Sequence, residues 1–161
     1  MTCQLPHVQR DDRPHFITFV TFQRWTLPPE ARSIVLESCT HDHLRTMELH
    51  AAVVMPDHVH LILTPAVNQD RGSVYRLDRI LWAIKSASAH RVNKLLGRSG
   101  KVWQEEYLDH VIRNSDSLLE KIEYVVENPV RAGLVQNAAE YPWMWIGPRA
   151  KAPAVVELLQ G

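Results

Sequence analysis

The sequence predicts an α+β fold: a ferredoxin-like antiparallel sheet with helices on one face, plus an added C-terminal helix. Stretches of alternating apolar residues and stretches of helical periodicity follow the order strand, helix, strand, strand, helix, strand, helix, which is typical of that fold. The chain has 161 residues, 45% of them hydrophobic and 22% charged, as in an ordinary globular domain. We therefore expect one domain over residues 1–148 and a flexible tail with few anchors over 149–161.

Three strands and one helix are predicted in the first half of the chain. Residues 15–23 alternate and are rich in aromatic and β-branched side chains, which indicates a strand. Two prolines open a helix over about 28–44, and a second strand follows over 48–55. The dipeptide Pro56-Asp57 favours a tight turn, so a third strand should begin at His58.

The second half is predicted to hold two helices and one strand. After a polar loop, residues 74–96 have the apolar spacing of a long amphipathic helix. Residues 102–113 supply the fourth strand. A last helix starts at Asn114 or Ser115, which can both cap it. Its apolar stripe would be Leu118, Ile122 and Val125.

The third strand contains two histidines, His58 and His60, two residues apart. Alternate side chains of a strand share one face, so both imidazoles should project together while Val59 and Leu61 point into the core. Two rigidly held imidazoles make half of a divalent metal site. The alternative is a pair of polar residues on the solvated face of a half-covered sheet.

Tyr124 and Asn128 are predicted to share one side of the last helix. Tyr124 is two residues past Ile122, about 200° around the helix, and Asn128 follows one turn later. A phenol on this side is available for chemistry or for a hydrogen bond. Two alternatives remain: Tyr124 as a boundary residue with a packed ring, and Asn128 as the cap of a short turn that opens with Pro129.

Basic residues concentrate in one segment of a chain whose formal net charge is zero. Residues 71–101 hold eight basic residues and one acid, so the rest of the chain is acidic. Phosphate contacts depend on such local charge. The candidate DNA-binding residues are Arg76, Arg79, Trp82, Lys85, Arg91 and Lys94, with Trp82 as a stacking platform for an unpaired base. The alternatives are a solvated helix face and a tryptophan that covers a loop.

Several classes of protein are disfavoured by composition. No apolar run approaches the ~20 residues that span a bilayer, and the N-terminus lacks the pattern of a signal peptide. Cys3 and Cys39 are the two cysteines and form no CxxC pair, which argues against a zinc ribbon. Few cysteines favour a reducing, cytoplasmic setting without a membrane.

Two motifs, in this order and spacing, resemble those of a known family. Residues 54–61, with histidine, valine, histidine at their centre, resemble the HUH motif of single-tyrosine transposases. Trp103-Gln104, Tyr107, residues 109–113 and Tyr124 through Asn128 to Val135 resemble one branch, the REP-associated tyrosine transposases. Tyr141-Pro142-Trp143 also fits, although Met144-Trp145 stands where that branch often has small hydroxyl residues. The resemblance covers about residues 15–146.

The resemblance implies a function and a site. His58, His60 and the side-chain oxygen of Asn128 would bind a divalent ion, and Tyr124 would attack DNA. Two nitrogens and one oxygen suit Mn²⁺ better than Mg²⁺, although Mg²⁺ could serve with phosphate and water oxygens. The substrate would be single-stranded DNA carrying a palindromic hairpin, cleaved through a 5′-phosphotyrosine link, in a bacterial, nucleoid-associated protein.

Other interpretations stay open from the sequence alone. The protein could be a hairpin-DNA-binding regulator with little transposition activity, or an unrelated metal-dependent hydrolase that uses both histidines with a carboxylate. Tyr107 is the rival nucleophile. The sequence assigns no proton acceptor for the tyrosine, and it does not distinguish a monomer from a homodimer.

Overall fold

The sheet of this protein is antiparallel and has the strand order β6-β1-β3-β2-β7. The computed structural model describes residues 12–160. The strands are β1 (His15–Val20), β2 (Met47–Val54), β3 (His58–Pro65), β6 (Leu108–Val111) and β7 (Met144–Ile146), and Val67–Asn68 (β4) and Ser73–Val74 (β5) form a separate hairpin. The main helices are α2 (Pro29–Thr40), α3 (Leu77–Leu96), α4 (Ser115–Arg131) and α5 (Pro153–Gln160).

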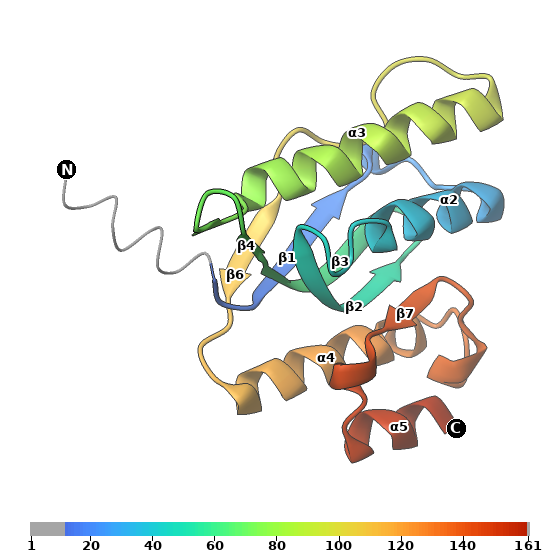
Figure 1. Ribbon diagram of the computed structural model, residues 1–161. Coiled ribbons are helices and arrows are strands. Elements are labelled where there is room, and N and C mark those ends of the chain that lie inside the picture. Colours follow the sequence, from blue (N-terminus) through green and yellow to red (C-terminus); the bar gives the residue numbers. More distant parts are fainter. Residues whose placement is uncertain (1–11, 161) are drawn as a thin grey trace.

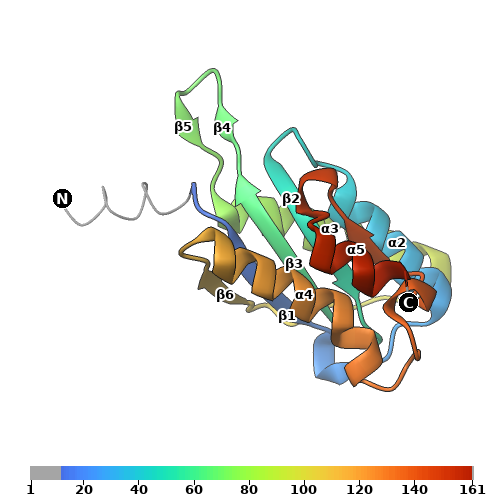
Figure 2. The same ribbon diagram turned by 90° about the horizontal axis from the view of Figure 1, so that it is seen from below.

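The predicted fold class is confirmed. The strand that carries the histidines is internal, because β3 pairs with β1 on one side and with β2 on the other. Helices α2 and α3 cover one face of the sheet, and α4 and α5 lie on the opposite face (Figures 1 and 2). The added helix therefore makes a third layer, and the histidine strand lies between the two helical layers.

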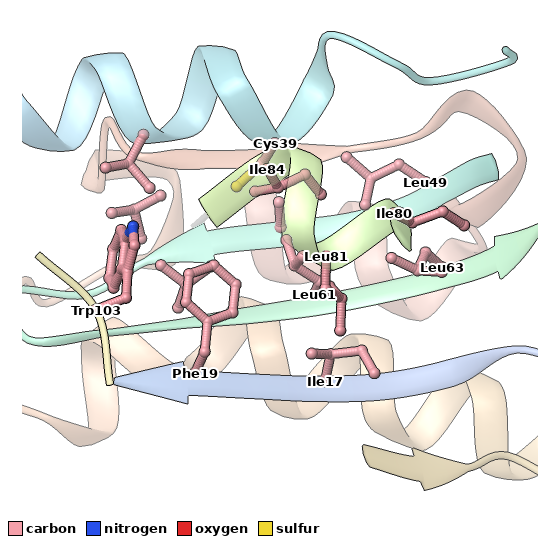
Figure 3. Close-up of a cluster of buried hydrophobic side chains, with 14 of the residues drawn as sticks. Ile17, Phe19, Cys39, Leu49, Leu61, Leu63, Ile80, Leu81, Ile84 and Trp103 are labelled. Atoms are coloured by element: carbon pink, nitrogen blue, oxygen red, sulfur yellow. The ribbon is translucent and has the colours of Figure 1, made fainter. Parts of the chain in front are cut away.

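Each face of the sheet has its own apolar core. The core under α2 and α3 contains Ile17, Phe19, Leu61 and Leu63 from the strands, and Figure 3 shows them packed against Leu81 of α3. The second core lies under α4 and α5. Strand alternation explains the division: residues 59, 61 and 63 point to the first core, whereas residues 58, 60 and 62 point toward α4.

The predicted strands and helices are present, several with bounds that differ at one or both ends, and three short strands and one α-helix were missed. Strand β1 ends at Val20 because a 3₁₀ turn, Phe22–Arg24, follows it. Strand β7, the β4–β5 hairpin and α5 were not predicted. They are short. In addition, β7 and α5 depend on distant segments, because β7 pairs with β2 and α5 packs against α4.

The prediction of a flexible tail over residues 149–161 is wrong for most of that segment, because residues 153–160 form α5. Val155 is fully buried in the second core, and α5 packs against α4. The first eleven residues of the predicted domain, Cys3 among them, lie outside the described residues.

Helix α4 settles one alternative. Asn114 caps it, since its Oδ1 accepts a hydrogen bond from the Ser117 amide at 2.9 Å. The helix continues through Pro129 to Arg131, so the interpretation of Asn128 as the cap of a new turn is wrong. Gly133 stops it in the left-handed conformation, at φ +76°.

Candidate functional site

His58 and His60 project side by side from β3 toward α4, as strand alternation predicts. Their ring centroids are 4.8 Å apart. His60 is 7% exposed, while His58 is partly open to solvent. Because β3 is held by a neighbour on each side, the two imidazoles are fixed by the sheet and not by a mobile loop.

The Nδ1 atom of each imidazole is occupied by a neighbour. The Nδ1 atom of His60 lies 2.8 Å from Thr18 Oγ1 on β1, and that of His58 lies 2.8 Å from the carboxylate of Asp57. Arg24 in turn holds Asp57 at 3.0 Å. Among the described residues, neither ring has a hydrogen-bond partner for Nε2. Such second contacts fix ring orientation and leave Nε2 to bind a metal.

The electrostatic surroundings favour neutral imidazole at His60. Burial, helped by the charges of His58 and Arg131, lowers the pKa of His60 to about 3. Burial opposes ionisation of Asp57, but the hydrogen bond from His58 and the charge of Arg24 outweigh it, so the pKa of Asp57 is below its usual value. Metal ions bind the neutral form of imidazole, and this is the form that the surroundings of His60 favour.

Tyr124 reaches this pair of histidines from α4. Its ring centroid lies 6.0 Å from that of His60 and 6.0 Å from that of Phe16, whose ring stacks on His60 at 5.2 Å. The side chain is 43% exposed. One side of the ring therefore packs on the sheet face while the rest is open to solvent. The two interpretations that the sequence left open, a packed ring and an accessible phenol, both apply to Tyr124.

Two cations flank the Tyr124 ring. The guanidinium carbon of Arg131 lies 4.1 Å from the ring centroid, and Arg131 Nη2 also donates to the Tyr124 carbonyl at 2.7 Å. Lys121 Nζ lies 5.8 Å from the same ring and 5.1 Å from the ring of Phe16. Positive charge at this position attracts an anionic phosphate.

Asn128 fits the role of a third metal ligand through one observation. Its Oδ1 atom is buried and has no hydrogen-bond partner among the described residues. A buried carbonyl oxygen without a partner costs about 1–3 kcal/mol, and a bound cation would remove that cost. Within residues 12–160 no three His, Cys, Asp or Glu side chains converge, so a third protein ligand to a metal at the two histidines would have to be of another type, such as this amide oxygen.

The structure does not bring the predicted DNA-binding residues of α3 to this site. They lie on the opposite side of the sheet (Figure 1). Arg76 is paired with Asp78, and Arg91 with Glu37. Lys85 Nζ donates to the Gln104 and Glu105 carbonyls, and burial lowers its pKa.

Three of the α3 candidates remain open to a ligand. Arg79 and Lys94 are exposed and have no partner within residues 12–160. Trp82 is 67% exposed, so it does not cover a loop. This part of the prediction is compatible with a nucleic-acid surface, but one that is separate from the histidines.

Sequence reasoning missed the residues that orient the site. Thr18 could not be found, because its contact with His60 depends on the strand register that pairs them. Asp57 and Arg131 had a signal: one precedes His58 directly, and the other follows Tyr124 by two helical turns. The rival Tyr107 packs against the first core, away from both histidines.

A sheet face with two strand histidines, opposed by a helix that bears a tyrosine, is the arrangement that the resemblance to single-tyrosine transposases implies. The chain is 26% identical over 118 residues to a putative REP-associated tyrosine transposase of Haemophilus influenzae and 30% identical over 100 residues to the REP-associated tyrosine transposase of Escherichia coli. This confirms the similarity to that family.

The extent of these matches is limited. They cover 71% and 62% of this chain, and 65% and 54% of the respective relatives, which is less than two thirds of each relative's length. No protein-family model matches the chain. The solved structure of a REP-associated tyrosine transposase bound to a REP hairpin has the same fold, with a TM-score of 0.66 at 22% identity, over 89% of this chain and 87% of that one.

The described part of the chain has no helix that is both long and apolar enough to cross a membrane.

Proposed function

We propose that this protein is a metal-dependent endonuclease and strand transferase for single-stranded DNA attached to a palindromic hairpin. The observation that carries the proposal is the approach of the Tyr124 ring to His60, at 6.0 Å within one chain. The curated relatives support DNA transposition as the activity, and the hairpin in the related structure supports the form of the substrate. Such an enzyme would act where bacterial DNA lies, in the cytoplasm.

The proposed reaction forms a covalent link between Tyr124 and DNA. The phenolic oxygen attacks phosphorus in line, the bond from phosphorus to the 3′ oxygen breaks, and a 5′-phosphotyrosine forms. The phenol gives up its proton, and the leaving 3′ oxygen takes one up as the free hydroxyl. Since the phosphodiester is exchanged and not hydrolysed, a second strand end can reverse the step and be joined.

His58, His60 and Asn128 would hold the metal ion, either Mn²⁺ or Mg²⁺. When bound, such an ion supplies Lewis-acid polarisation of the scissile phosphate, worth several kcal/mol. The protein's part would be to present the Nε2 atoms of two imidazoles and one amide oxygen. Thr18 and Asp57 keep the rings in place from behind.

The nucleophile needs help, because a free phenol with a pKa near 10 is ionised about one part in a thousand at pH 7, a handicap of ~4 kcal/mol. Arg131 and Lys121 are the cations in contact with the Tyr124 ring. They would attract the scissile phosphate to the phenol, and the phenol proton would pass to solvent.

The experiment that tests the nucleophile compares wild type, Tyr124→Phe and Tyr107→Phe. Each is incubated with labelled single-stranded DNA and Mn²⁺, and covalent adducts are separated on a denaturing gel. We expect an adduct with wild type and Tyr107→Phe and none with Tyr124→Phe. Loss of the adduct only in Tyr107→Phe would overturn the assignment.

A second experiment tests the metal ligands. His58→Ala and His60→Ala should each abolish cleavage while hairpin binding is largely kept. Cleavage that survives both substitutions would exclude a catalytic metal at this site. If wild type binds hairpins without forming any adduct, the protein is a hairpin-binding regulator instead.

We also propose that the exposed side of α3 contacts the hairpin duplex, through Arg79, Trp82 and Lys94. The double variant Arg79→Ala/Lys94→Ala should weaken hairpin binding and make it less salt-dependent. Lys85 is left out, because it is bound to two backbone carbonyls. An unchanged salt dependence would remove α3 from the interface.

A further inference from the structure

A groove of about 780 Å³ lies between β6 and the beginning of α4. Its lining includes Arg13, His110, Arg113, Asn114, Ser115 and Leu118. His110 is paired with Phe16 of β1, which packs in the core under α4, so the groove reaches the sheet face that α4 covers. It is therefore on the same side of the molecule as Tyr124, unlike the basic residues of α3.

The groove presents two guanidinium groups, those of Arg13 and Arg113, that form no ion pair among residues 12–160. Arg13, His110 and Arg113 are exposed and have no hydrogen-bond or ion-pair partner among residues 12–160. The acid in the lining, Asp109, is held by the His15 ring at 2.7 Å. By contrast, three of the five cations predicted to bind DNA in or next to α3 are bound to other groups of the protein: Arg76, Lys85 and Arg91.

The beginning of α4 adds to this potential. The positive end of a 17-residue helix dipole lies at Ser115, which lines the groove. Asp116, also in the first turn, offsets part of it. The dipole is a supporting feature, and the two guanidinium groups are the main source of attraction for an anion.

The lining of the groove adjoins residues next to the candidate active site on both β6 and α4. His110 is the cross-strand neighbour of Phe16, whose ring stacks on His60 and lies under Lys121. Along α4, Leu118 precedes Tyr124 by six residues, a rise of ~9 Å. A strand that leaves Tyr124 toward the beginning of α4 passes Lys121 and then enters the groove.

Apolar surface for bases accompanies the charge. Leu108, on the same face of β6 as His110, is 74% exposed, and Phe16 is partly exposed beside it. Single-stranded nucleic acid is bound by this combination of a basic groove and apolar contacts for unpaired bases. A duplex keeps its bases stacked inside and would leave such contacts unused.

We propose that the groove between β6 and α4 binds the backbone of the single-stranded DNA segment next to the phosphate that Tyr124 attacks. This rests on the proposed function and names the part of the substrate that it concerns. Arg13 and Arg113 each neutralise a phosphate, and His110 lies between them and the catalytic face.

The test measures salt dependence of binding in the Tyr124→Phe background, so that no cleavage interferes. An unstructured oligonucleotide and a blunt hairpin are each titrated over a series of salt concentrations. Arg13→Ala/Arg113→Ala should reduce the slope of log K against log salt for the oligonucleotide by about 1.4, because each neutralised phosphate of a single strand accounts for ~0.7 of that slope. The slope for the blunt hairpin should change little.

The matched control is Arg45→Ala/Lys151→Ala. It removes two exposed cations that lie outside the groove and outside the basic segment of residues 71–101. Its slope for the oligonucleotide should equal that of the parent. Arg13→Lys/Arg113→Lys keeps the charge and should restore the parental slope.

An unchanged slope in Arg13→Ala/Arg113→Ala would overturn the proposal, as would an equal reduction in the control. A larger effect on the blunt hairpin would assign the groove to duplex DNA and also overturn it. These readouts need no catalysis. Absence of a wild-type adduct therefore rejects the nuclease function without deciding the groove, and a normal adduct with unchanged slopes rejects the groove alone.

Discussion

Arg131 contacts Tyr124 in two ways that have different consequences. Its guanidinium lies over the Tyr124 ring, and its Nη2 donates a hydrogen bond to the backbone carbonyl of Tyr124. The first contact places a positive charge beside the candidate nucleophile, whereas the second stabilises the end of α4. Glu127 is a weaker partner, at 4.0 Å on an exposed surface.

Arg131→Ala should slow adduct formation by about 2- to 30-fold, since a cation over an aromatic face contributes ~0.5–2 kcal/mol. Single-turnover rates of adduct formation check this.

Arg131→Lys is the control, and it should retain more of the rate than Arg131→Ala. A thermal melt of each variant separates an effect on the ring from a loss of helix stability. Equal rates in all three proteins would show that Arg131 only supports the helix end.

Cys39 is a buried thiol whose pKa burial raises to about 12. In a Cys3→Ser variant we expect Cys39 to be inert toward a thiol reagent at pH 8 in the folded protein and to react fully in denaturant. Unfolding returns the thiol pKa to its ordinary value near 9. The unfolded chain therefore releases a proton above that pH, and the free energy of unfolding should fall as pH rises. Rapid labelling of the folded protein would contradict the burial.

At the scale of elements, α4 contributes to two parts of the molecule. One side of the helix packs on the second core through Ile122, Val125 and Val126. Another side carries Tyr124 and the buried oxygen of Asn128. Any change in the packing of α4 on the sheet therefore moves the nucleophile relative to the histidines.

Helix α5 supports α4 from outside the sheet. Val155→Ala removes two methyl groups from a fully buried position and should lower the free energy of unfolding by about 1–3 kcal/mol. Denaturant titration measures it. Glu157→Ala, at an exposed position on the same helix, is the control and should stay within ~0.5 kcal/mol of wild type. Equal stability of both variants would mean that α5 is a loose tail.

At the scale of the whole molecule, a bound metal ion would join β3 to α4. Binding to the folded state alone stabilises it by RT ln(1 + [L]/Kd), which is ~2.7 kcal/mol at one hundred times Kd. We expect saturating Mn²⁺ to raise the melting temperature of wild type, and chelation to reverse the increase. His58→Ala should lose this response, whereas His110→Ala, which removes an exposed histidine elsewhere on the sheet, should keep it.

Asn128→Ala gives the complementary result. Without metal it should keep or raise the free energy of unfolding, because it removes a buried oxygen that has no hydrogen-bond partner in the described chain. With Mn²⁺ it should show a smaller increase in melting temperature than wild type. A full response to Mn²⁺ would exclude Asn128 as a ligand.

The local sequence pattern was sufficient to predict much of this protein's secondary structure and which residues share a face. Alternation put His58 and His60 on one face because neighbouring strand residues point in opposite directions. Helical periodicity put Tyr124 and Asn128 on one side of α4 because the helix repeats every 3.6 residues. Both relations involve residues a few positions apart, so they can be seen in the sequence without knowing what packs against them.

Only the tertiary structure decided which surfaces meet. That α4 covers the histidine face while α3 lies behind the sheet depends on the strand order and the two cores, and neither is a local property. The partners of Lys85 are 19 and 20 residues away, and Val155 is buried only because α4 and the sheet lie beneath it. The chain's own pattern thus determined which residues share a face, whereas long-range packing chose the faces that form the site, because burial of apolar surface depends on contacts between distant segments.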